Sequence, residues 1–134
     1  MAGSRGLVVS SGERQVLRVL ERYNGMVKVF PKVNFFDVID WNTEMGYTEH
    51  GFLERTHFDF VVCENEMPYR PLFNVEYDGL SNGYKSDSDN NRDWKMNVKK
   101  RISEKEGLPL LVLTEKDLSN LDETIKEFML NLLL

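Results

Sequence analysis

Two segments near the middle of the chain restrict its fold most, because each combines strand-forming residues with acids. Residues 55–63 (RTHFDFVVC) and 71–78 (PLFNVEYD) are rich in the aromatic and β-branched side chains that favour β-strands. The link between them contains Pro68, which favours a turn. The sequence therefore predicts a hairpin of two strands.

Side chains two residues apart share one face of a strand. In the first segment this alternation predicts that three apolar residues share a face: Phe58, Phe60 and Val62. His57 and Asp59 would lie on the opposite face.

The second segment alternates in the same way. Its apolar residues Phe73, Val75 and Tyr77 would point to one face, and its polar residues Asn74, Glu76 and Asp78 to the other. If the two strands pair, the carboxylates of Asp59, Glu76 and Asp78 converge on one side of the sheet near a strand end.

Three acids among apolar neighbours cost free energy unless a positive charge lies between them. A hard divalent cation would resolve this conflict, and a carboxylate-rich site suits Mg²⁺ or Mn²⁺ better than zinc. The sequence thus predicts a metal site at Asp59, Glu76 and Asp78. The alternative is structural: Asp59 could pair with Arg55 or Arg70, and Asp78 could begin a turn.

The rest of the chain predicts helices and strands in an order typical of an α/β domain. We expect helices at 11–23, 91–106 and 122–134, strands at 26–33 and 110–113, a short helical turn at 35–41, and loops at 42–53 and 79–89. The apolar run 110–113 is typical of an interior strand. The fold class is therefore a three-layer α/β domain over residues 10–134, a mixed four-stranded sheet flanked by helices, with residues 1–9 as a flexible tail.

Composition narrows the classes of function. The chain has 134 residues, one cysteine and a net charge of −5, with 41% hydrophobic residues. No apolar run is long enough to span a membrane and no signal peptide is evident, so we expect a soluble cytoplasmic protein with Cys63 packed in its core. The negative charge disfavours nucleic acid, yet residues 92–105 carry six of the seventeen Lys and Arg residues.

The segments HFDFVV (57–62), NVEYDG (74–79), RDWK (92–95) and GLPLL (107–111) together resemble the PD-(D/E)XK nuclease superfamily, which has the restriction-endonuclease-like fold. The pattern is most similar to a prokaryotic domain family of unknown function near the very-short-patch-repair endonucleases. The resemblance covers roughly residues 10–115.

The resemblance implies roles for individual residues. Asp59 would be the metal-binding aspartate and Glu76 the acid of the second strand motif. Asp78 stands where the superfamily usually has its lysine, so the positive group must come from elsewhere. We expect Lys95 to supply it, with Lys99 or Arg55 as alternatives.

Two further positions bear on the resemblance. Asn82 stands where relatives usually carry a histidine. Glu13 matches an acid that relatives place near the metal, but it also completes a Ser-x-x-Glu capping box with Ser10, and both interpretations stay open. His57 could shuttle a proton, although a lone strand histidine is more often structural.

The leading hypothesis is a Mg²⁺- or Mn²⁺-dependent endonuclease that acts on DNA. Arg92, Lys95 and Lys99 share a helix face and could bind the phosphate backbone. Asp78 and Asn82 favour a second hypothesis, a nucleic-acid-binding module that has lost turnover. A third is a homodimer or partner-protein contact through the Leu-rich residues 128–134.

Overall fold

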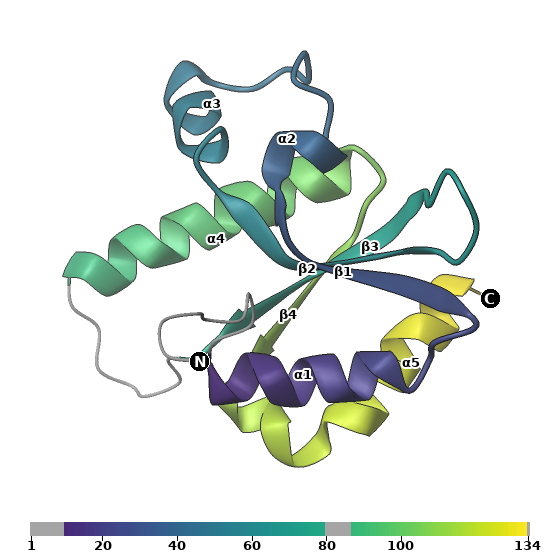
Figure 1. The fold of residues 1–134 in the computed structure, drawn as a ribbon. Coiled ribbons are helices and arrows are strands. Elements are labelled where there is room, and N and C mark those ends of the chain that lie inside the picture. The colour runs from purple at the N-terminus through teal and green to yellow at the C-terminus, as the bar shows by residue number, and fades with distance from the viewer. Residues whose placement is uncertain (1–9, 80–86, 134) are drawn as a thin grey trace, which may run out of the picture.

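The computed structural model describes residues 10–79 and 87–133. Its elements are α1 (Ser11–Glu21), β1 (Val27–Asn34), α2 (Phe35–Val38), α3 (Tyr47–Leu53), β2 (His57–Glu64), β3 (Pro71–Asp78), α4 (Asp87–Lys105), β4 (Leu110–Thr114), the 3₁₀ helix η1 (Glu115–Asn120) and α5 (Leu121–Leu133). Figure 1 labels the α-helices and the strands. The predicted tail 1–9 and Asn82 lie outside the described residues.

The four strands form one mixed sheet in the order β1-β2-β3-β4. The first three are antiparallel neighbours, whereas β4 pairs parallel to β3 after the α4 crossover. This confirms the predicted α/β class, and Pro31 lies in an edge strand, where a proline is tolerated. The prediction that residues 110–113 form an interior strand was wrong: β4 is the other edge, and its apolar run reflects burial of both faces.

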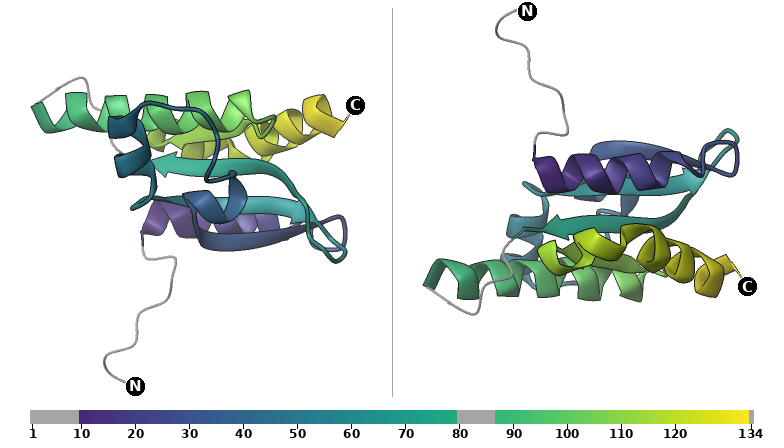
Figure 2. Two further views of the ribbon diagram at one scale, coloured as in Figure 1. Left: turned by 90° about the horizontal axis from the view of Figure 1, so that it is seen from above. Right: turned by 90° about the horizontal axis from the view of Figure 1, so that it is seen from below.

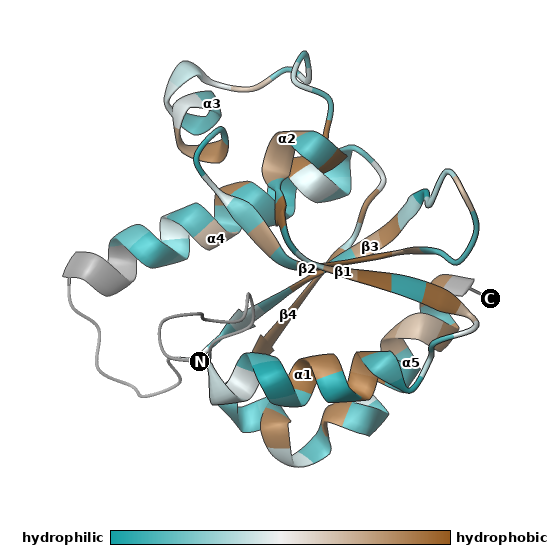
Figure 3. Cartoon of the chain, viewed as in Figure 1, coloured by the Kyte–Doolittle hydropathy of each residue, from teal (hydrophilic) through white to brown (hydrophobic). Residues whose placement is uncertain are grey.

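Helices cover both faces of the sheet. One view in Figure 2 looks onto the face with α2, α3 and α4 in front of the strands, and the other onto the face with α1 and α5. Each face has its own apolar core, and Figure 3 shows the hydrophobic residues concentrated along the strands between the two helical layers. No helix among residues 10–79 and 87–133 is long and apolar enough to cross a membrane.

The alternation predicted for β3 is confirmed. Phe73, Val75 and Tyr77 pack into the core beneath α1 and α5, and the three polar residues between them face α4. The alternation predicted for β2 was wrong at Phe58. This ring packs with the α4-side core, while Phe60 packs with the α1-side core.

The cause of that change lies in the neighbouring strand. Lys32 has a positive φ of 52°, and the ladder between β1 and β2 continues on either side of it without a pair between Lys32 and Asp59. A left-handed residue inside a strand breaks its regular pleat. Asp59 lies at this break, between two phenylalanines that enter different cores.

The predicted loop at 42–53 was also wrong in part, because residues 47–53 form α3. The Glu49 carboxylate accepts a hydrogen bond from the Gly46 N–H at 3.0 Å, which caps the first turn. Leu53 is fully buried in the α4-side core and anchors the other end of the helix. Tertiary packing therefore stabilises a helix that has weak local signals.

The Leu-rich C-terminal helix is largely used inside the domain. Met129 is buried, Phe128 packs against Phe73 with ring centroids 5.0 Å apart, and Leu132 contacts the same core. Leu130 is exposed. The predicted dimer or partner contact through this helix stays a prediction.

Candidate active site

The candidate site lies where β2 and β3 separate. Their ladder reaches Phe60 opposite Val75 and goes no further toward the start of β2. Asp59 is the next residue, and its Oδ2 accepts a hydrogen bond of 2.8 Å from the Tyr77 N–H. The Asp59 carboxylate thus takes the place of a backbone carbonyl as the acceptor for this N–H. It is thereby held at the opening between the two strands.

Asp59 and Glu76 form a buried pair of carboxyl groups. Each carboxyl group shifts the pKa of the other, and the residues are only 7% and 4% exposed. Burial raises the pKa of Glu76, the charge of Asp59 adds to this, and the pKa lies well above its usual value. Burial also opposes ionisation of Asp59, but the neighbouring Glu76 carboxyl group, the hydrogen bond from the Tyr77 N–H and the Lys32 ammonium together leave its pKa lowered. Ionisation is therefore less favourable for Glu76 and more favourable for Asp59 than in the free side chains.

Two lysines contact this pair from opposite sides. The Lys99 ammonium group contacts Glu76 and donates a hydrogen bond of 2.8 Å to the His57 carbonyl oxygen. The Lys32 ammonium lies 3.3 Å from Asp59 Oδ1 and 3.1 Å from Glu13 Oε2. Each acid therefore has its own cation, supplied by lysine and not by the Arg55 or Arg70 that the structural alternative named.

Glu13 reaches the site because α1 packs closely on β3. A Cβ atom at Gly12 would lie 2.2 Å from the Tyr77 ring, so only glycine allows this approach. Half of the predicted capping box is present: Ser10 Oγ accepts a hydrogen bond of 3.0 Å from the Glu13 N–H. The Glu13 carboxylate, however, turns to Lys32.

His57 lies at the edge of the site. Its Nε2 is 3.8 Å from Asp59 Oδ1. Burial lowers the pKa of the imidazole, and the nearby charge of Lys32 adds to this effect. The ring is therefore neutral at pH 7 and can accept a proton.

The polar face of β3 meets one stripe of α4 in three successive contacts. Asn74 Nδ2 donates to Ser103 Oγ at 3.0 Å, Glu76 contacts Lys99, and Asp78 Oδ1 lies 3.4 Å from Arg92 Nη2. Asp78 therefore faces Arg92, although the sequence placed it with Asp59 and Glu76. Two residues of strand advance the chain by roughly 6.6 Å, which carries Asp78 past the opening.

The described parts of the chain contain no group of three or more His, Cys, Asp or Glu side chains that could hold a metal ion. The sequence predicted that three acids converge. Among the described residues, Asp59 and Glu76 form a close pair, and the carboxylate of Asp78 is displaced along β3. Cys63, as expected, is buried in the α4-side core.

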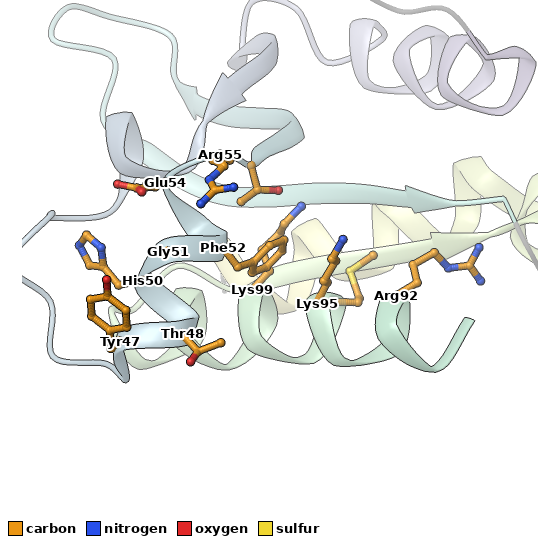
Figure 4. A pocket seen from close by; sticks show the side chains of 12 residues that line it. Tyr47, Thr48, His50, Gly51, Phe52, Glu54, Arg55, Arg92, Lys95 and Lys99 are labelled. Atoms are coloured by element: carbon orange, nitrogen blue, oxygen red, sulfur yellow. The ribbon is translucent and has the colours of Figure 1, made fainter. Parts of the chain in front are cut away.

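A cleft of about 930 Å³ opens next to the acid pair, between α3 and the first half of α4. Figure 4 shows Lys99, Lys95 and Arg92 in a row along its α4 wall. Arg55 contributes a fourth cation, and among the lining residues that the structure describes Glu54 is the only acid. The three residues predicted to bind nucleic acid thus share one concave surface.

Of the two α4 lysines in the cleft, Lys99 is the one that contacts the acid pair. Lys95, the expected positive group, projects into the cleft one turn away, with its ammonium 5.7 Å from the centroid of the Phe52 ring. Both lysines lie on the same face of α4, so their spacing alone does not distinguish them. Burial does, because Lys99 is only 8% exposed whereas Lys95 is exposed.

Sequence reasoning missed Lys32 and the α3 wall of the cleft. Lys32 has no motif around it, and its relation to Asp59 depends on the register between β1 and β2. The α3 wall follows from the helix that was taken for a loop. A clue was present in Glu49, three residues after Gly46 at the start of a short apolar pattern.

Comparison with known proteins gives a family without an activity. Residues 5–132 match the model of a family described as "Protein of unknown function (DUF2726)". The chain belongs to this family. No curated protein and no solved structure matches the chain.

Proposed function

We propose that this member of the DUF2726 family is a metal-dependent nuclease of the PD-(D/E)XK type that hydrolyses phosphodiester bonds in DNA. The observation that carries the proposal is the buried Asp59–Glu76 pair at the opening between β2 and β3, directly beside a cationic cleft. Two contacting acids under apolar side chains are costly for folding alone. Proteins bury such groups, at a cost in folding free energy, mainly at functional sites.

The residues fit a magnesium or manganese ion better than zinc. Magnesium in phosphate-processing sites is typically bound by one or two carboxylates, with waters and substrate phosphate as the other ligands. Asp59 and Glu76 would supply those carboxylates, and Glu13 lies close by on the other side of Lys32. When bound, the ion would act as a Lewis acid toward the phosphate and lower the pKa of a coordinated water.

Side chains of the protein would perform the remaining roles in catalysis. Lys99 lies at the junction of the acid pair and the cleft, so its ammonium would stabilise charge that develops on the phosphate. Lys95 and Arg92 follow Lys99 along α4 (Figure 4) and would hold the backbone on one side of the scissile bond. His57, neutral at pH 7, would accept a proton at the edge of the site.

The test is cleavage of plasmid and single-stranded DNA with Mg²⁺ or Mn²⁺. Asp59→Asn and Glu76→Gln each keep the side-chain shape and should reduce cleavage by roughly a hundredfold or more, because each removes a charged ligand. Glu127→Gln, an exposed acid on α5, is the matched control and should cleave like the wild type. Equal activity in all three variants would show that another group performs the chemistry or that the cleavage is a contaminant.

A second candidate is a nucleic-acid-binding module without turnover. Lys32 and Lys99 already neutralise Asp59 and Glu76, which favours a site that is stable without a metal ion. Such a protein would bind DNA in a salt-dependent manner and show no cleavage with either metal. For either candidate we propose a cytoplasmic location, in keeping with DNA as the ligand and with a single free cysteine.

A further inference from the structure

The α3 wall of the cleft is aromatic. Tyr47, His50 and Phe52 line it from one short helix, and the Tyr47 side chain is 95% exposed. The His50 ring stacks on Phe36 at 4.8 Å and meets the edge of Trp41 at 4.3 Å. A ring as exposed as Tyr47 adds almost nothing to the core, so its place at the mouth of a cleft suggests contact with a ligand.

The opposite wall is cationic. The charges of Arg92 and Lys99 face the carboxylates of Asp78 and Glu76. In contrast, Lys95 and Arg55 have no carboxylate partner among the residues whose side chains the structure describes, 10–79 and 91–132. The cleft therefore offers at least two uncommitted cations to a polyanion such as a phosphate backbone.

We propose that the cleft binds single-stranded DNA, with bases stacked on the α3 aromatic side chains and phosphates along α4. This inference rests on the proposed nuclease function and specifies its substrate. Cations attract the backbone of any nucleic acid, but aromatic rings can stack only on bases whose faces are free. In a duplex the base faces are stacked on each other, so exposed aromatic residues inside a cationic cleft favour an unpaired strand.

The direction of the cleft agrees with this arrangement. Figure 4 shows Lys99, Lys95 and Arg92 along α4, with Phe52 beside Lys99 and with Tyr47 and His50 farther out on α3. Lys99 both lines the cleft and contacts Glu76. A strand stacked on α3 would therefore present a backbone phosphate at Lys99, next to the acid pair.

The experiment measures binding without cleavage. Fluorescence anisotropy in EDTA compares a labelled oligothymidylate with a mixed-sequence duplex of the same length. The wild type should bind the single strand more tightly than the duplex. Tyr47→Ala should weaken single-strand binding by about tenfold, the typical effect of losing one stacked base, and leave duplex binding unchanged.

Two variants control for other causes. Tyr47→Phe retains the ring and should bind single strands like the wild type. Met26→Ala removes an exposed apolar side chain far from the cleft and should change neither affinity. Because Tyr47 is almost fully exposed, Tyr47→Ala should unfold at the same temperature as the wild type.

Several results would overturn the inference: duplex binding at least as tight as single-strand binding, an unchanged affinity in Tyr47→Ala, or equal losses for both substrates. An oligouridylate bound as tightly, with the same dependence on Tyr47, would instead extend it to RNA. The nuclease proposal fails separately. Single-strand binding that depends on Tyr47, without cleavage in Mg²⁺ or Mn²⁺, would contradict only the nuclease proposal. Cleavage of duplex DNA alone, in a manner that depends on Asp59, would contradict only the present inference.

Discussion

The two faces of the sheet use their buried positions differently. The face beneath α1 and α5 is covered almost entirely by apolar side chains. The face beneath α4 combines a second apolar core with the polar series Asn74–Ser103, Glu76–Lys99 and Asp78–Arg92. The comparison teaches that one layer supplies stability, so the other can bury groups that cost free energy and serve chemistry.

The largest expected effect is on the apolar face. Phe60 is fully buried there, and Phe60→Ala should lower the free energy of unfolding by about 3–5 kcal/mol, because the lost contacts leave a cavity. Urea denaturation measures the change. Leu130→Ala, an exposed apolar residue on α5, should stay within about 0.5 kcal/mol of the wild type. A small effect at Phe60 would mean that this face does not carry the stability assigned to it.

The next effect concerns the buried ion pair on the polar face. Lys99→Met and Glu76→Gln should each cost roughly 2–3 kcal/mol, and the double variant should lose less than their sum, by about 1–3 kcal/mol. The cost is moderate because a Glu76 carboxyl group without its partner can remain protonated. The exposed pair Lys100–Glu104, 3.0 Å apart, is the control, and its coupling should be below about 1 kcal/mol. Equal coupling in the two pairs would contradict the importance of burial.

Cys63 allows a pH test of the apolar part of the α4 face. Burial raises the pKa of its thiol to about 11. Since the folded state favours the neutral thiol, this contribution is complete below the ordinary pKa near 9 and is lost as the pH rises toward 11, by roughly 2–3 kcal/mol at most. The free energy of unfolding should thus fall more steeply between these pH values in the wild type than in Cys63→Val. Parallel curves would show that the thiol is accessible to water.

The smallest effect on stability is expected in the cleft. Lys95 is exposed, so Lys95→Ala should change the free energy of unfolding by less than about 0.5 kcal/mol. It should nevertheless weaken DNA binding and reduce the slope of log K against log salt by about 0.7, the value for one phosphate contact on a single strand. Lys126→Ala on α5 should leave the slope unchanged. An unaltered slope in Lys95→Ala would remove this residue from the interface.

Local pattern was enough to predict the sheet and half of the site. In β3 the period of two placed Glu76 on the polar face correctly, because this strand pairs with β4 without interruption from Asn74 to Asp78. In β2 the same period failed at Phe58, because the pleat is broken by the positive φ of Lys32 in the neighbouring strand. A lysine in that conformation follows from tertiary contacts, and nothing in the sequence around it indicates them.

The cations of the site show the same limit. Lys95 and Lys99 are one turn apart on the same helix face, so both are candidates by their spacing. Which of them approaches Glu76 depends on how far α4 is shifted along β3, and that shift is set by the packing of Val98 and Ile102 into the core. The α3 wall was missed because a seven-residue helix depends on Leu53 burial more than on propensity.

The series of contacts between β3 and α4 also makes the length of that helix critical. Four helical residues span about 6 Å and two strand residues about 6.6 Å. The spacing of Lys99 and Ser103 along α4 therefore matches that of Glu76 and Asn74 along β3. Inserting one residue between Val98 and Ile102 would turn everything beyond it by about 100° and uncouple one end of the series from the other. Exposed residues of α4 outside the cleft can therefore be substituted more easily than a residue can be inserted or deleted.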